Sequence, residues 1–178
     1  MNEKNRLERL KLRMGARRLT LATLFGVIIF AFKTVLPTPI DKIFVFIQAL
    51  LLSLGYLMLG APGATYVSMV GGLLTALWRA PFAPFTIAFA LLYGLLIDVL
   101  SLIFKVKEVN NEIKTKRVIA TVTMSTAVVG LASYYTTTHV LAILPRNPIL
   151  EMSILIAGVI NGLIGGYLSV SIWKKILS

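Results

Sequence analysis

Between Gly60 and Asp98 two long apolar segments follow one another with only a short turn between them. In the first segment a small residue stands at every fourth position, namely Gly60, Ala64, Ser68, Gly72 and Ala76. Residues at this spacing line up on one face of a helix and form a groove that another helix can approach closely. The second segment repeats the pattern at Thr86, Ala90 and Gly94. Two apolar helices grooved for packing predict a hairpin inside a membrane.

The composition of the whole chain supports this interpretation. Of the 178 residues 57% are hydrophobic, and the mean hydropathy is +0.86, which is too apolar for a soluble domain of this size. A membrane-spanning helix needs ~20 mostly apolar residues, and the chain has room for about six. The chain has no cysteine, which excludes disulfides and thiolate metal sites.

We therefore predict an all-α membrane protein, a bundle of six transmembrane helices in residues 19–178. Residues 1–18 are strongly basic and are expected to lie on an anionic leaflet as a short interfacial or frayed helix. Clusters of Pro and Gly separate the apolar segments because proline removes a backbone donor and breaks helices. The expected spans are 19–36, 43–59, 64–79, 83–104, 118–144 and 149–173.

The basic residues predict the orientation in the membrane. The net charge is +11, but the Lys and Arg residues stand in blocks between apolar runs, which is typical of a membrane topology signal and not of a nucleic-acid-binding face. With six spans, fourteen of them fall on the side of the termini and four on the other side. The positive-inside rule therefore predicts cytoplasmic termini in a multi-pass protein of the plasma membrane.

No motif in the sequence indicates an enzyme. His139 is the single histidine, and neither G-x-S-x-G nor H-E-x-x-H occurs. The phosphate-binding pattern G-x-x-x-x-G-K-[ST] is also absent, so the chain does not hydrolyse ATP by that route. We predict no catalytic residue, no metal site and no cofactor.

Two polar residues lie well inside expected spans. Asp98 follows the small stripe of its helix and should face the bundle, either as part of a proton or cation relay or as a group that forms a salt link or hydrogen bond near the cytoplasmic surface. The second role is favoured because no other titrating group lies at that depth. Asn161 stands among Gly158, Gly162 and Gly166, whose spacing predicts close helix packing. Its amide should bond another helix or a ligand.

Aromatic and polar side chains gather at the expected outer ends of the helices. Interfacial aromatics are ordinary membrane anchors, but the same groups also suit a pocket for a flat, polar heterocycle. The segment 118–144 is rich in hydroxyls, which predicts that it lines a site or binds other helices. The residues that we expect to contact a substrate are Trp78, Arg79, Phe85, Tyr134, Tyr135, His139, Glu151 and Asn161.

Several stretches resemble the substrate-binding S components of energy-coupling factor (ECF) vitamin transporters. The basic tail followed by RRLTLATLFGVIIFAF looks like the opening of these proteins. Within the group, APGATYVSMVGGLLTALWRAPFAPFTIAFALLYGLLIDVLSLIFK is similar to the YkoE-type family, which is assigned to hydroxymethylpyrimidine or related thiamine precursors. The ending GVINGLIGGYLSVSIWKK resembles the last helix of that family. Members often carry a carboxylate in the third helix, where this chain has Ser68 and Met69.

The resemblance implies a six-helix subunit that captures a vitamin or precursor from outside the cell. Its partners would be a transmembrane coupling (T) subunit and two ATPase subunits, which supply the missing phosphate-binding loops. Ala22 and Gly26 occupy the place of the small pair that contacts the coupling subunit in the family. The Pro-containing loop 37–42 would be the external gate.

Two other classes of function stay open at this point. The chain could be a structural or assembly subunit that uses its small-residue grooves only for packing. It could also be a self-contained secondary carrier or channel, although it has neither paired intramembrane charges nor an evident internal repeat. Saturable binding of a small ligand by the isolated chain distinguishes the first interpretation from the structural subunit. Ion-gradient-dependent uptake without ATPase subunits would favour the carrier or channel.

Overall fold

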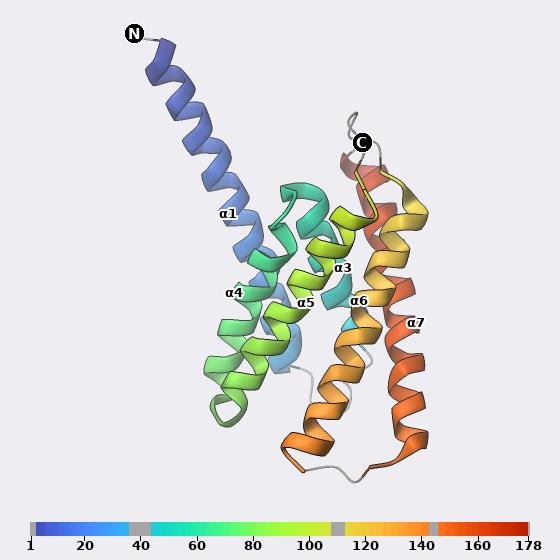
Figure 1. Ribbon diagram of the computed structural model, residues 1–178. Helices are drawn as coiled ribbons and strands as arrows, with labels where there is room; N and C mark the ends of the chain where they lie inside the picture. Colours follow the sequence, from blue (N-terminus) through green and yellow to red (C-terminus); the bar gives the residue numbers. More distant parts are fainter. Residues whose placement is uncertain (1–2, 36–43, 108–112, 143–145, 178) are drawn as a thin grey trace.

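A computed structural model describes residues 3–35, 44–107, 113–142 and 146–177. These residues form helices and contain no β-strand, as predicted. The six α-helices are α1 (Glu3–Val35), α3 (Val45–Leu59), α4 (Gly63–Trp78), α5 (Ala83–Ile103), α6 (Thr115–Tyr135) and α7 (Pro148–Ile172), shown in Figure 1. Short helical turns extend three of the ends, at Ala80–Phe82, Thr136–Val140 and Trp173–Leu177.

Three helical segments are long and apolar enough to cross a membrane. They are Ala80–Ile103, Thr115–Val140 and Pro148–Lys175. The other three apolar helices are shorter, at Leu19–Val35, Val45–Leu59 and Gly63–Trp78. These lengths identify a membrane protein, while six complete spans stay a prediction.

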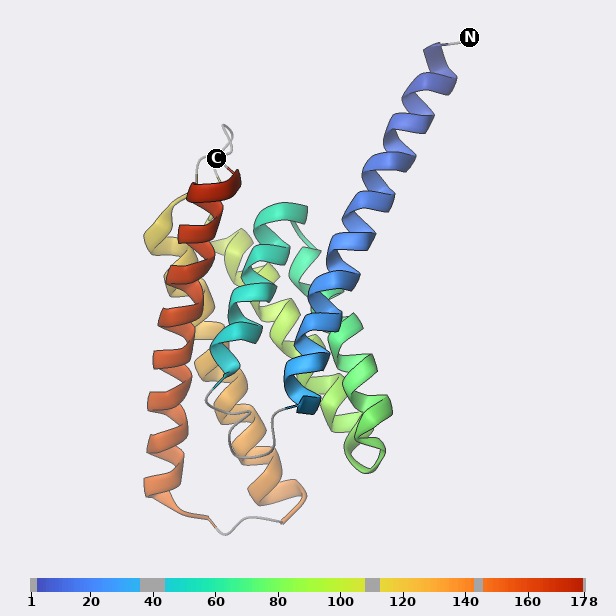
Figure 2. The same ribbon diagram turned by 180° about the vertical axis from the view of Figure 1, so that it is seen from behind.

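The basic N-terminal segment belongs to helix α1. This helix runs without a break from Glu3 into its apolar half, and the position of the segment on an anionic leaflet stays a prediction. The first half of α1 extends past the other helices at the end where the C-terminus also lies (Figures 1 and 2). Uninterrupted helix is favoured here because no proline stands between Glu3 and Val35.

Helix α3 is the centre of the bundle. It contacts all five other helices, and every residue from Leu51 to Leu57 is buried. A helix that is apolar on all sides is expected to lie in a core of this kind. With 15 residues α3 is about 22 Å long, shorter than the 25-residue α7 beside it.

The glycines of α7 bring it against α6 in the close packing that their spacing predicts. A Cβ atom at Gly162 would lie 2.5 Å from the Cα of Thr123, and one at Gly166 would lie 3.0 Å from the Cα of Ile119. Such distances leave no room for a side chain, so backbone packs directly on backbone. The tandem glycines are therefore used inside the fold.

We expect Gly162→Ala to destabilise the protein by about 1–3 kcal/mol because the new methyl group meets the backbone of α6 and forces the helices apart. Gly130→Ala is the matched control. A Cβ at Gly130 meets only Ile154 Cγ2, at 3.7 Å, which is an ordinary contact. Because alanine favours a helix more than glycine does, Gly130→Ala should leave the stability of the protein unchanged or raise it slightly. The free energy of unfolding, measured by SDS titration with circular dichroism, checks both. Equal effects of the two substitutions would contradict the proposed backbone contact.

Candidate functional site

Asp98 on α5 caps the N-terminus of α4. Its Oδ1 accepts from the backbone N of Ala64 at 3.2 Å, and its Oδ2 accepts from the backbone N of Thr65 at 2.8 Å and from Thr65 Oγ1 at 2.6 Å. The first N–H groups of a helix have no partner in their own helix, so a carboxylate from the next helix serves them. This arrangement agrees with the hydrogen-bonding role favoured from the sequence.

Asn161 does the same for α3. Its Oδ1 accepts from the backbone N of Phe46 at 3.0 Å, and its Nδ2 donates to the carbonyl of Ala157 at 2.9 Å. Asn161 lies near the middle of α7, so the first turn of α3 lies at the mid-depth of that helix. In the described residues α3 therefore lines only one half of α7, the half that leads to its C-terminal end.

Further polar side chains lie at this depth on α5 and α6. Gly162 packs beside Thr123 and Thr126, which places this part of α6 next to Asn161. Tyr93 on α5 shares a hydrogen bond of 2.6 Å with Thr126 Oγ1. We call Tyr93, Ser125, Thr126 and Asn161 the mid-depth polar group.

Three hydroxyls of α6 are buried without a hydrogen-bond partner in the structure, those of Thr121, Thr123 and Ser125. Ser125 is completely buried and Thr121 is 1% exposed. Most serine and threonine side chains in the described part of this protein bond the carbonyl four residues earlier, as Thr126 does to Val122. These three hydroxyls can therefore still form a hydrogen bond with another group, such as a ligand.

Four of the residues predicted to contact a substrate lie where α6 and α7 meet, at the opposite end of the bundle from the termini. Tyr134 is buried, and its hydroxyl donates to the carbonyl of Asn147 and accepts from the backbone N of the same residue, both at 3.1 Å. The hydroxyl of Tyr135 donates to Glu151, and its ring lies 5.7 Å from the ring of His139. The structure brings these four predicted residues, Tyr134, Tyr135, His139 and Glu151, into one neighbourhood.

The α4–α5 turn holds the other predicted residues, at a separate corner of the same end (Figures 1 and 2). Trp78 is 68% exposed, as expected for a membrane anchor. Arg79 Nη2 donates to the carbonyl of Lys33 at 2.8 Å and so joins α4 to the end of α1. Phe85 is half-buried. The two corners stand apart in both views, so the predicted outer residues form two groups, while the predicted residue Asn161 lies at mid-depth.

The small pair on α1 lies inside the fold. Ala22 is 1% exposed, and a Cβ at Gly26 would lie 2.7 Å from Val70 Cβ and 3.0 Å from the backbone N of Gly71. Helix α4 therefore covers the face on which a contact with a coupling subunit was expected. That contact stays a prediction, and the external gate expected at 37–42 falls outside the described residues.

The sequence did not point to Tyr93, and it did not distinguish Thr121 and Ser125 from the other hydroxyls of the segment 118–144. Tyr93 stands in an apolar run, and hydroxyls are common along the whole of α6. Their distinguishing property is the presence or absence of a partner on another helix, which only the packing shows. Comparison of the chain with protein-family models, with curated proteins and with solved structures finds no match in any of the three.

We expect Asp98→Asn to destabilise the protein by about 1–3 kcal/mol because an amide nitrogen replaces one acceptor and leaves a buried N–H or O–H unpaired. Glu151→Gln is the control, since it removes the same charge from a side chain at the less buried end and should change stability by less than about 0.5 kcal/mol. Thermal unfolding in detergent measures both. A similar small effect of the two substitutions would show that the α4 cap contributes little.

Proposed function

We propose that the chain is the substrate-binding membrane subunit of an ATP-driven importer of the energy-coupling factor type. It captures a small vitamin or vitamin precursor, such as hydroxymethylpyrimidine or thiamine, from outside the cell. A transmembrane coupling subunit and two ATPase subunits complete the transporter in the plasma membrane. This protein itself carries no catalytic residue and no cofactor.

The mid-depth polar group carries the proposal. Small-molecule sites are mostly apolar, with a few converging polar groups that orient the ligand. The interior of this bundle is also mostly apolar with a few polar groups. At the depth where α3 begins, the polar side chains of Ser125 and Asn161 lie among apolar ones. A buried hydroxyl without a partner costs about 1–3 kcal/mol. A ligand that bonds Ser125 recovers this cost, which favours binding at that depth.

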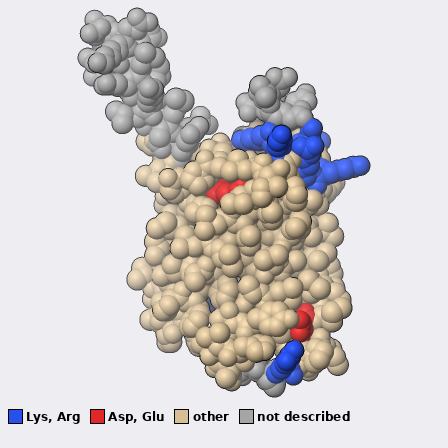
Figure 3. Space-filling model, viewed as in Figure 1, with Lys and Arg blue, Asp and Glu red and all other residues tan. Residues whose placement is uncertain are grey.

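The charge distribution supports an outward-facing site. In Figure 3 the blue Lys and Arg side chains gather mainly at the end of the bundle where the C-terminus lies. The basic residues at or beside the helix ends on that side include Lys105, Lys116, Arg117, Lys174 and Lys175. The positive-inside rule assigns that end to the cytoplasm, so the end with Tyr134, Tyr135 and His139 faces outward. A ligand from outside would reach the mid-depth polar group from there.

The packing disfavours the two alternative functions. An assembly subunit would present its small-residue grooves to a partner, whereas Gly162 and Gly166 are covered by α6 of this chain. A proton-coupled carrier needs a carboxylate that can change its bonding, whereas both oxygens of Asp98 are held as a helix cap. Among the described residues there is also no cluster of side chains that could hold a metal ion.

The first test is a ligand screen on the purified full chain in detergent. Thermal unfolding is measured with thiamine, hydroxymethylpyrimidine and other water-soluble vitamins. A true ligand at a hundredfold excess over its dissociation constant should stabilise the protein by about 2.7 kcal/mol, which is visible as a higher melting temperature. A shift with one compound and not with its close analogues supports the proposal. No shift with any vitamin would count against it and favour an assembly subunit.

The second test asks whether the Ser125 hydroxyl contributes to ligand binding and not to the stability of the free protein. We expect Ser125→Ala to leave the free protein equally stable or more stable, because an unpaired buried hydroxyl is removed. The same substitution should reduce the ligand-induced melting shift. The control is Ser153→Ala, whose exposed hydroxyl bonds the carbonyl of Ile149 in its own helix. An unchanged shift in the Ser125 variant would remove this residue from the binding site.

A further inference from the structure

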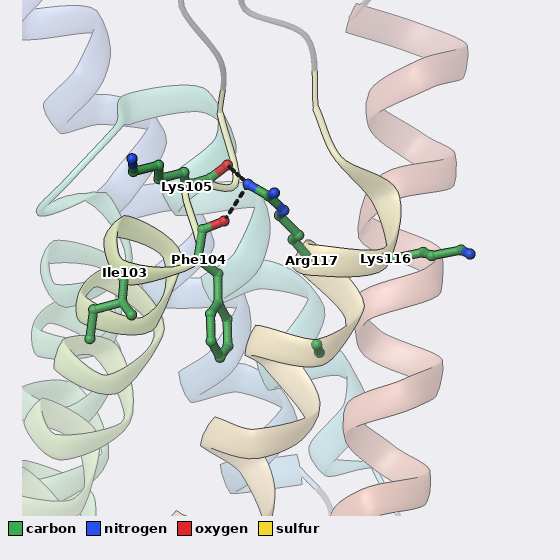
Figure 4. Close-up of a pocket in the computed structure, with 6 residues that line it drawn as sticks. Ile103, Phe104, Lys105, Lys116 and Arg117 are labelled. Carbon is green, nitrogen blue, oxygen red and sulfur yellow. Dashed lines mark hydrogen bonds between the residues drawn. The ribbon is translucent and has the colours of Figure 1, made fainter.

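A hollow of about 450 Å³ opens where α5 ends and α6 begins. It is lined by Ile103, Phe104, Lys105, Lys116, Arg117 and Ala120. Figure 4 shows Arg117 reaching from α6 across to the end of α5, with Ile103 and Phe104 on the far side. The hollow is at the basic end of the bundle, far from the mid-depth polar group and from the outer aromatic residues. None of the functions considered above uses it.

Hydrogen bonds hold the rim of the hollow in place. Arg117 Nη1 donates to the carbonyls of Phe104 at 2.9 Å and of Lys105 at 3.2 Å. The backbone N of Val106 donates to Ser101 at 3.0 Å, and that of Lys114 donates to Val106 at 3.2 Å. The described bonds of Arg117 use only Nη1, while its Nη2 and Nε carry three further N–H groups. The guanidinium is therefore fixed in position with donors that an anion can use.

The charge at the hollow suits an anionic ligand. Lys105, Lys116 and Arg117 all line it, and Lys105 and Lys116 are exposed at the surface. Their flexible side chains can turn toward a bound anion. The segment 105–117 has five Lys and Arg residues against two glutamates, so it is positive as a whole.

The apolar side of the hollow continues along the lipid-facing surfaces of two helices long enough to span a membrane. Ile103 and Ala120 are exposed beside the basic residues. One helical turn further, Val99 on α5 is 47% exposed and Met124 on α6 is 48% exposed. A ligand with a charged head and an apolar tail would contact both the basic residues of the hollow and the apolar surface next to them. A small soluble anion would contact only the basic residues.

We propose that the hollow binds the phosphate of an anionic phospholipid from the leaflet at the basic end of the bundle. Arg117 and the two lysines hold the phosphate group, and an acyl chain lies along Ile103, Ala120 and the exposed residues beyond them. The lipid bridges the ends of α5 and α6 on the outside of the bundle. The proposal depends on the membrane location of α5 and α6 and not on the identity of any transported substrate.

The test measures lipid binding to the full chain in detergent by native mass spectrometry. Phosphatidylglycerol and phosphatidylcholine with the same acyl chains are titrated separately. We expect phosphatidylglycerol to bind at least tenfold more tightly. Lys105→Gln combined with Lys116→Gln should weaken its binding by about fivefold for each lysine removed. Equal binding of the two lipids would overturn the proposal.

Two further variants make the test specific to this hollow. Lys174→Gln combined with Lys175→Gln removes two charges from the same end of the bundle, outside the lining of the hollow, and should leave the affinity within twofold. Ala120→Trp fills the apolar side and should weaken phosphatidylglycerol binding while the protein stays folded by circular dichroism. An equal loss in both lysine pairs would overturn the proposal, because it would show general attraction to a basic surface.

A competition experiment distinguishes a lipid from a free anion. Inorganic phosphate is added at millimolar concentration to the protein with phosphatidylglycerol bound. We expect the lipid to stay bound, because soluble phosphate lacks the apolar contacts. Displacement of the lipid by inorganic phosphate, with the same stabilisation against heat, would show that the site takes a small anion and would overturn the lipid assignment.

Discussion

The structure depends on satisfying the backbone N–H groups at helix starts that lie among apolar side chains. In hydrocarbon no water serves these donors, so each needs an acceptor from the protein. Neither α3 nor α4 has a side-chain cap of its own, since Phe44 and Pro62 stand at the capping positions. Asn161 and Asp98 serve them from other helices. Two polar residues in long apolar segments thus fix where the neighbouring helices begin, and this explains their place in the interior without any titrating role.

Helices α5 and α6 contribute residues to both the mid-depth polar group and the basic hollow. The hydrogen bond between Tyr93 and Thr126 joins the two helices in the interior, and Ser125 lies next to that bond in sequence. At the basic end the two helices separate around the hollow held by Arg117. A ligand inside the bundle and a lipid outside it would therefore act on the same pair of helices. By contrast, α6 and α7 are held by backbone contact along the glycines of α7.

The sequence predicted the helices well and the site only in part. The four-residue spacing of glycines is a property of local geometry, so it predicted close helix packing at Gly162, although not that α6 is the partner. Proline marked the helix breaks for the same reason. The partners of Asp98 could not be predicted, because its donors include backbone groups of Ala64 and Thr65, and nearly every residue carries such groups. The burial of Ala22 and Gly26 under α4 was also hidden, since a small pair does not indicate which helix covers it. The outer residues fall into two corners because they lie at two helix connections, α4–α5 and α6–α7, and the sequence does not locally encode how these connections are placed relative to each other.

The cap of α3 has a consequence for how the chain is made. Ala64 and Thr65 receive their acceptor from the following helix, only 34 and 33 residues later. Phe46 is 115 residues from Asn161, which lies on α7. During biosynthesis the start of α3 is therefore without its final acceptor until the 115 residues that lead to Asn161 have also been made. Until then water or the insertion machinery must serve that N–H group, so the arrival of α7 completes the centre of the bundle.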